Sequence, residues 1–235
     1  MKAIIFDKDG TLIDFDAFWL NISRQAIGEV LNICRLPENL LFQIMEAFGV
    51  HNGVTSIEGV VCKGTYAQMG TIVYDILKSH GCQIGREDMI RLVTDLYVKH
   101  SDAGQILPTT LKLKETLQTL KSRGLKLAVV TTDNLEMTLK CLKTLGVDRL
   151  FDVIYTDDGV IPTKPDPACA EDFCRRFDLQ REDVLMVGDT MTDVEFAGNA
   201  GLTMIGVAKT EENKTLLQQY IEKVVPDVSY IPELI

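Results

Sequence analysis

The sequence predicts an α/β fold, a doubly wound (Rossmann-like) parallel sheet core with an inserted all-helical cap domain. Short apolar runs alternate with helical segments in the C-terminal half, and another apolar run opens the chain. A long stretch of purely helical periodicity lies between them. The 235 residues exceed one typical domain but fall short of two full-sized ones, which favours one core with a smaller appendage.

The first predicted strand is residues 2–7 (KAIIFD), an apolar run that ends at the turn signal Asp9-Gly10. It reads as a strand buried on both faces, as expected in a parallel sheet. Glycines at positions 124 and 146 then end helical segments ahead of further apolar runs. The remaining predicted elements of the core are helix 109–121, strand 125–130, helix 134–145, strand 151–155, helix 167–176, strand 184–187, helix 192–200 and strand 202–207.

Residues 16–100 show apolar side chains at helical spacing without strand-like interruption. Ile27, Val30 and Leu31 share one predicted helix face, and Val93 and Tyr97 share another. We therefore predict a catalytic core of residues 1–15 and 101–235 and a helical cap of residues 16–100. An insert at this point can sit over the carboxyl ends of the strands, where doubly wound folds bind ligands.

Composition and charge limit the classes of partner. The net charge of −10 and the pI of about 4.8 disfavour nucleic acid and anionic membrane surfaces. No leader-like segment and no uninterrupted 18-residue apolar stretch occurs, so a cytoplasmic location is expected. The six cysteines lack metal-ligand spacing and are expected to be reduced. The sequence specifies no oligomeric state.

Carboxylates follow two of the predicted strands. Asp7 and Asp9 follow the first strand, and Asp189 and Asp193 follow the apolar run at 184–187. Taken alone, the first pair is as compatible with a strand-ending turn as with a functional site, and the second is more typical of a helix N-terminus. Together they would meet at one edge of the sheet, where their repulsion calls for a cation. Oxygen ligands with few histidines or cysteines favour Mg²⁺.

Two further polar residues follow strands of the same predicted sheet. Thr131 comes directly after the run at 125–130, with Thr132 as a competing hydroxyl, and Lys164 precedes a proline. A hydroxyl and an ammonium can both bind phosphoryl oxygens. Each residue alone is more typical of a capping or solvated group.

Taken in order, the segments DKDGT at 7–11, VVTT at 129–132, Lys164 with Pro165, and GDTMTD at 188–193 resemble the haloacid dehalogenase superfamily. The similarity is greatest to its phosphoglycolate-phosphatase-like branch, whose helical cap matches the predicted insert. The motifs span nearly the whole predicted core.

The resemblance implies a magnesium-dependent phosphatase acting on a small phosphorylated metabolite through an aspartyl-phosphate. Asp7 would be the nucleophile and Asp9 the general acid and base. Thr131 and Lys164 would bind the phosphoryl group. The metal would be held by the Asp7 side chain, the backbone carbonyl of Asp9 and Asp189, with Asp193 as an organiser of the metal site.

The acid at position 9 separates this chain from the superfamily's P-type ATPases and dehalogenases, which lack it. A phosphomutase resembling β-phosphoglucomutase would share every catalytic residue and stays an alternative. A phosphonatase ranks below it because no cap lysine stands out as a nucleophile. A non-catalytic binding or regulatory module on the same fold is the remaining alternative.

The predicted cap holds few specific signals. Four residues in its loop region are candidates for substrate specificity, namely Glu58, Lys63, Tyr66 and Gln68. They are chosen by position alone.

Overall fold

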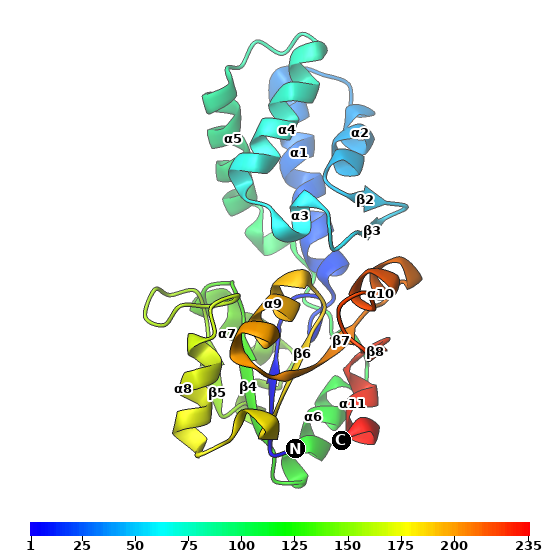
Figure 1. The fold of residues 1–235 in the computed structure, drawn as a ribbon. Helices are drawn as coiled ribbons and strands as arrows, with labels where there is room; N and C mark the ends of the chain where they lie inside the picture. The colour runs from blue at the N-terminus through cyan, green and yellow to red at the C-terminus, as the bar shows by residue number, and fades with distance from the viewer. The chain divides into compact units, whose positions relative to one another are not determined.

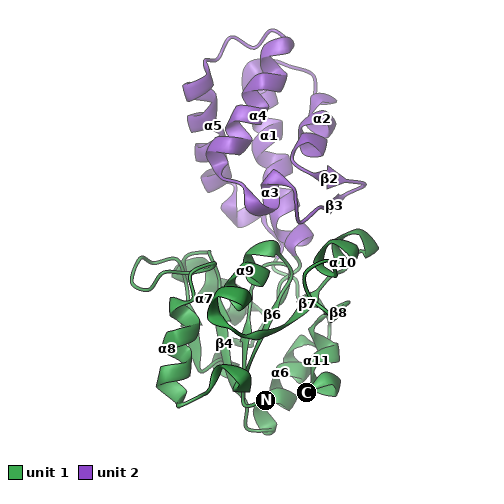
Figure 2. Cartoon of the chain, viewed as in Figure 1, with its two compact units in different colours: residues 1–14, 106–235 green, residues 15–105 purple.

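The computed structural model describes residues 1–235 and divides into two compact units (Figure 2). Unit 1 comprises Met1–Asp14 and Ile106–Ile235, and unit 2 comprises Phe15–Gln105. Unit 2 is therefore inserted into the chain of unit 1 directly after the first strand and its following loop.

Unit 1 is built on a six-stranded parallel sheet with the strand order β5-β4-β1-β6-β7-β8 (Figure 1). The strands are β1 (Ala3–Phe6), β4 (Lys126–Val130), β5 (Val153–Tyr155), β6 (Val184–Gly188), β7 (Thr203–Val207) and β8 (Val224–Val225). The order reverses at β1, which lies between β4 and β6. This arrangement confirms the predicted doubly wound fold. The two-residue β8 was not predicted, because a segment so short carries no periodicity.

The sheet is buried on both faces, as the continuous apolar strands indicated. Ala3 and Ile5 of β1 belong to a core cluster that includes Phe173 and Phe196 from helices on one face. Ile4 points to the other face and is also fully buried. Two-sided burial explains why the strands read as apolar runs rather than as alternating patterns.

The helices of unit 1 follow the strands in the predicted alternation. In Figure 1, α6 and α8 lie on opposite sides of the sheet. The predicted start of α6 at residue 109 was four residues early, because residues 109–112 form turns. The helices are α6 (Leu113–Ser122), α7 (Leu135–Thr144), α8 (Ala168–Phe177), α9 (Met191–Ala200), α10 (Glu211–Leu217) and α11 (Ile231–Leu234), with short 3₁₀ turns at η3 (Asp148–Leu150), η4 (Arg181–Asp183) and η5 (Val228–Tyr230).

Unit 2 is mainly helical. Its elements are η1 (Asp16–Leu20), α1 (Asn21–Cys34), α2 (Leu40–Ala47), β2 (Val50–His51), β3 (Val54–Thr55), α3 (Val60–Lys63), α4 (Tyr66–Ser79), α5 (Arg86–Lys99) and η2 (Ser101–Ala103). The small antiparallel hairpin of β2 and β3 was not anticipated, since each strand has only two residues.

Close helix packing holds unit 2 together. A Cβ atom at Gly70 of α4 would lie 2.6 Å from the Cα atom of Ile90 in α5, so the glycine permits the two backbones to approach. The buried Tyr97 of α5 donates a hydrogen bond of 2.8 Å to the hydroxyl of Ser23 in α1. This bond satisfies two polar groups inside an apolar interface.

None of the helices in the structure is both long enough and apolar enough to cross a membrane.

Candidate active site

The strand register brings three of the predicted residues to one edge of the sheet. Phe6 of β1 pairs with Val129 of β4 on one side and with Val187 of β6 on the other. Asp7 follows Phe6 directly, and Thr131 and Asp189 follow the ends of the two flanking strands. All three side chains therefore leave the sheet at its carboxyl edge, beside the point where the strand order reverses.

A tight loop after β1 brings the first motif against the last. Gly10 has a φ of +87°, and its amide donates a hydrogen bond of 2.8 Å to the carbonyl of Ile13. A Cβ atom at Gly10 would lie 2.0 Å from Oδ2 of Asp189. Any side chain at position 10 would thus occupy the place of the carboxylate. The hydroxyl of Thr11, which is fully buried, donates to Oδ1 of Asp189 at 2.9 Å.

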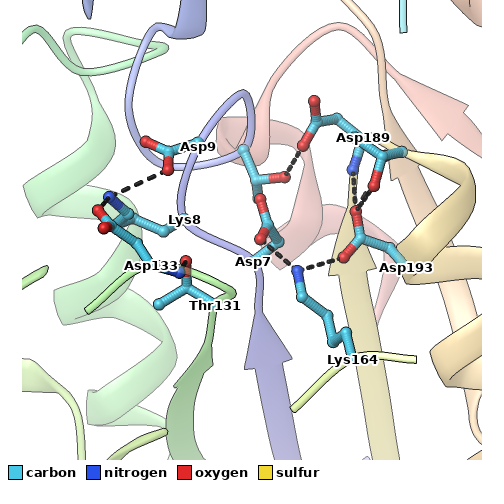
Figure 3. A network of polar contacts seen from close by, with 10 residues as sticks. Asp7, Lys8, Asp9, Thr131, Asp133, Lys164, Asp189 and Asp193 are labelled. Carbon is cyan, nitrogen blue, oxygen red and sulfur yellow. Dashed lines mark hydrogen bonds and ion pairs between the residues drawn. The ribbon is translucent and has the colours of Figure 1, made fainter. Parts of the chain in front are cut away.

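Lys164 is the cation at the centre of this edge. It is buried, and its ammonium forms ion pairs with Asp7 and, at 2.6 Å, with Asp193 (Figure 3). Burial lowers the pKa of Lys164, but the Asp193 and Asp7 carboxylates raise it by more than burial lowers it, so the net shift is upward. The lysine is therefore charged at neutral pH.

Asp193 fixes the start of α9. Its Oδ2 accepts hydrogen bonds from the amides of Asp189 and Thr190, at 3.1 and 2.9 Å, and from the Thr190 hydroxyl at 2.8 Å. Its Oδ1 accepts from Lys164. Asp193 thus joins the helix N-terminus to the lysine and orders the loop that carries Asp189.

The cluster carries an excess of negative charge. Asp7, Asp189 and Asp193 are buried, and one oxygen of each lies within 4.8 Å of the others. Burial raises the pKa of Asp7 to about 6, against the lowering effect of the Lys164 ammonium. Burial, followed by the charges of Asp7 and Asp193, raises the pKa of Asp189 well above its usual range. Three carboxylates against one ammonium make this a place that could hold a divalent cation with oxygen ligands.

Asp9 lies outside that carboxylate group. Its Oδ2 forms an ion pair of 3.0 Å with Lys8, and Lys8 also contacts Asp133 at 2.5 Å. Figure 3 shows Asp9, Lys8 and Asp133 as one group and Asp7, Lys164 and Asp193 as a second. Oδ1 of Asp9 is buried and has no hydrogen-bond partner. Asp9 thus has one carboxylate oxygen in an ion pair, Oδ2, and one without a hydrogen-bond partner, Oδ1.

Thr131 is buried directly after the end of β4. Its hydroxyl oxygen accepts a hydrogen bond of 3.2 Å from the amide of Asp133. Because the oxygen is the acceptor in this contact, the hydroxyl proton can be donated to a ligand.

Lys8, Asp133 and Thr11 were missed as functional candidates. Lys8 lies between two candidate aspartates in the sequence, where a lysine is usually expected to be exposed to solvent, yet it is fully buried. Its burial between two carboxylates depends on the loop after β4, which periodicity does not describe. Thr11 was quoted in the motif without a role, and its bond to Asp189 joins positions 178 residues apart.

The four candidates for substrate specificity lie in unit 2 and make local contacts there. Lys63 and Glu58 form an ion pair with each other. The Gln68 side chain accepts from the amide of Thr65 at 2.8 Å, within a capping box at the start of α4. The ring of Tyr66 packs against that of Tyr97 with centroids 5.2 Å apart. Gln68 therefore has a structural task that position alone did not reveal.

Comparisons with known proteins place this arrangement in a family. Residues 1–201 match the model of the haloacid dehalogenase-like hydrolases. The chain is 35% identical over 118 residues to Pyrophosphatase PpaX of Halalkalibacterium halodurans, covering 48% of this chain and 55% of that one. It thus spans about half the length of that relative.

Two other relatives cover more of the chain. A phosphoglycolate phosphatase of Mannheimia succiniciproducens is 37% identical over 206 residues, covering 88% of this chain and 85% of that one. A solved structure, described as a predicted phosphoglycolate phosphatase from Haemophilus somnus, has a TM-score of 0.71 and 24% identity, with 100% and 97% of the two chains covered. The solved structure shows the same fold. With the family model matching most of the chain, this protein belongs to the haloacid dehalogenase-like hydrolases.

Proposed function

We propose that this protein is a magnesium-dependent phosphatase that hydrolyses a small phosphorylated metabolite through an aspartyl-phosphate on Asp7. The observation that carries the proposal is the buried cluster in which Lys164 pairs with both Asp7 and Asp193 while Asp189 lies alongside. Several relatives named as phosphatases support the same reaction class.

The residues present fit a magnesium ion. The donors are carboxylate oxygens, Gly10 leaves room for Asp189, and the cluster has three carboxylates against the single ammonium of Lys164. In this proposal the side chains of Asp7 and Asp189 and the backbone carbonyl of Asp9 hold the ion, and Asp193 supports them. When bound, Mg²⁺ supplies charge neutralisation for the phosphoryl oxygens and for the carboxylates.

Asp7 acts as the nucleophile. Its oxygen attacks phosphorus and the bond from phosphorus to the leaving oxygen breaks, which gives an aspartyl-phosphate and the alcohol. Lys164 holds the Asp7 carboxylate in place and offers positive charge to the phosphoryl group. The Thr131 hydroxyl donates to a phosphoryl oxygen. Phosphoryl transfer depends mainly on such positioning and charge stabilisation.

Asp9 carries the proton. In the first step it donates a proton to the leaving oxygen. In the second step it removes a proton from water, which attacks phosphorus and releases phosphate, so that Asp7 and Asp9 both return to their starting states. Asp9 is near Asp7 in sequence but is separately held by Lys8, which allows the two carboxylates to take different tasks.

The two units suggest a division of labour. We assign the chemistry to unit 1 as the catalytic core. The helical unit 2 serves as a cap that excludes bulk water during transfer and selects the substrate. Glu58, Lys63, Tyr66 and Gln68 are the proposed specificity positions, although Gln68 also caps α4. The relatives named above act on different phosphates, so the substrate is proposed only as a small phosphorylated metabolite.

Phosphate release provides the direct test. The purified protein is incubated with phosphoglycolate, hexose phosphates, pyrophosphate and acetyl phosphate, with Mg²⁺ or with a chelator. We expect release of phosphate from at least one compound, loss of release on chelation and recovery when Mg²⁺ is restored. Absence of release at every Mg²⁺ concentration would contradict the proposal, and conversion of a hexose phosphate into its isomer would identify a phosphomutase instead.

A further inference from the structure

Lys8 is a buried cation with no obvious place in the reaction described above. Its side chain is completely inaccessible to solvent, and it pairs with Asp9 at 3.0 Å and with Asp133 at 2.5 Å. Burial lowers the pKa of Lys8, but the charges of Asp9 and Asp133 raise it by more than burial lowers it, so the net shift favours the charged ammonium. Figure 3 shows the lysine between these two carboxylates.

A buried ammonium needs close partners, because removal from water disfavours its charged form. Here the partners come from two different loops. Asp9 belongs to the loop after β1, and Asp133 belongs to the loop after β4, where its amide also donates to Thr131. The ion pairs therefore connect the Asp9 side chain to the segment that carries the phosphate-binding hydroxyl.

The two oxygens of Asp9 are in different states. Oδ2 contacts Lys8, whereas Oδ1 is buried and unpartnered. A buried polar atom without a partner is energetically disfavoured, and such atoms commonly have a functional explanation. A substrate oxygen or the attacking water would supply the missing partner.

We propose that Lys8, anchored by Asp133, is a positioning residue that holds Oδ2 of Asp9 and thereby presents Oδ1 as the atom that exchanges a proton with substrate and water. The inference rests on the proposed function. Oδ1 gives its proton to the oxygen that leaves phosphorus and later takes one from the attacking water. In this scheme Lys8 positions the Asp9 carboxylate and transfers no proton itself.

This role predicts a dependence on the leaving group. Ethyl phosphate and acetyl phosphate are similar in size, but ethoxide needs a proton as it leaves, whereas acetate is a stable anion. Loss of a correctly placed acid should therefore slow phosphoryl transfer from ethyl phosphate and leave transfer from acetyl phosphate nearly unchanged. General acid catalysis contributes on the order of 10²–10⁴ in rate, which sets the scale of the selective loss.

The experiment compares wild type, Lys8→Met, Lys8→Arg and Asp133→Asn at saturating Mg²⁺. The single-turnover rate of phosphoenzyme formation is measured with each of the two substrates. For Lys8→Met we expect a loss of about 100-fold or more with ethyl phosphate and less than about threefold with acetyl phosphate. Lys8→Arg should restore part of the rate with ethyl phosphate, since it keeps the charge. Asp133→Asn should show a smaller loss of rate, again larger with ethyl phosphate than with acetyl phosphate.

Equal losses of rate with ethyl phosphate and acetyl phosphate in the folded variants would overturn the inference, because they would mean that Lys8 supports the nucleophile or the fold. An unchanged or faster rate with ethyl phosphate in Lys8→Met would also overturn it, since Lys8 would then be holding Asp9 away from the reaction. If Lys8→Met does not fold, Asp133→Asn and Lys8→Arg decide by the same ratio of rates. Failure of the proposed function would be seen separately, because the wild-type protein would then form no phosphoenzyme from either substrate.

Discussion

Replacing Asp7 with Asn is expected to abolish phosphate release, with a fall in kcat of at least ~10⁴-fold, because the amide cannot attack phosphorus. The substitution should leave the fold intact. Burial and the neighbouring Asp193 charge disfavour the Asp7 carboxylate and raise its pKa, so a neutral side chain of the same shape relieves repulsion in the cluster. We expect the free energy of unfolding to be unchanged or higher, measured by denaturant titration beside the phosphate assay.

The matched control is Asp95→Asn, which makes the same chemical change at an exposed position of α5. It should keep the wild-type rate. The Asp7→Asn preparation needs a mass check, because deamidation would regenerate the aspartate. A deamidation-free variant that retains wild-type kcat would remove Asp7 from the role of nucleophile.

Replacing Lys164 with Met is expected to give the second large effect. The ammonium forms ion pairs with Asp7 and Asp193, and in the proposed mechanism it also supplies positive charge to the transferred group. Loss of one such preorganised donor lowers kcat by about 10²–10³-fold in other enzymes, and a similar loss is expected here. Leaving buried carboxylates without their cation also destabilises a protein by about 3–5 kcal/mol. Saturation kinetics and denaturant unfolding measure the two effects.

Added Mg²⁺ distinguishes the effect of Lys164→Met on kcat from its effect on stability. A bound cation offsets carboxylate repulsion, so added Mg²⁺ should raise the free energy of unfolding more in Lys164→Met than in the wild type, without restoring kcat. Lys143→Met, on the exposed surface of α7, is the control for loss of a lysine charge. A Lys164→Met enzyme that keeps normal kcat at saturating Mg²⁺ would show that the lysine serves the fold alone.

The sequence was most informative where buried strands end in polar residues. The apolar run before Asp7 and the run before Gly188-Asp189 predicted parallel strands of one sheet, and the structure shows that β1 and β6 are neighbours whose ends lie together. Both faces of the sheet are covered, so the strands had to read as continuous apolar runs. This direct link between burial and pattern is the reason that the doubly wound core was predictable.

Contacts between loops were not predictable in the same way. Lys8 and Asp133 are 125 residues apart, and nothing in either local pattern indicates that they pair. Lys8 also forms an ion pair with Asp9, so the surroundings of the Asp9 side chain could not be predicted either. Gln68 looked like a loop residue available to substrate, but its amide caps α4 because Thr65 precedes it at capping-box spacing. The β2–β3 hairpin was too short to carry a pattern.

The most direct test of the aspartyl-phosphate route is the stereochemical course of the reaction at phosphorus. A thiophosphate ester that carries two different oxygen isotopes on phosphorus is hydrolysed by the wild-type protein with Mg²⁺ in water enriched in the third isotope, and the configuration of the released chiral thiophosphate is determined. Two successive in-line displacements, first by Asp7 and then by water, each invert phosphorus and together give net retention. Net inversion would mean that water attacks the substrate directly, and it would contradict the role assigned to Asp7.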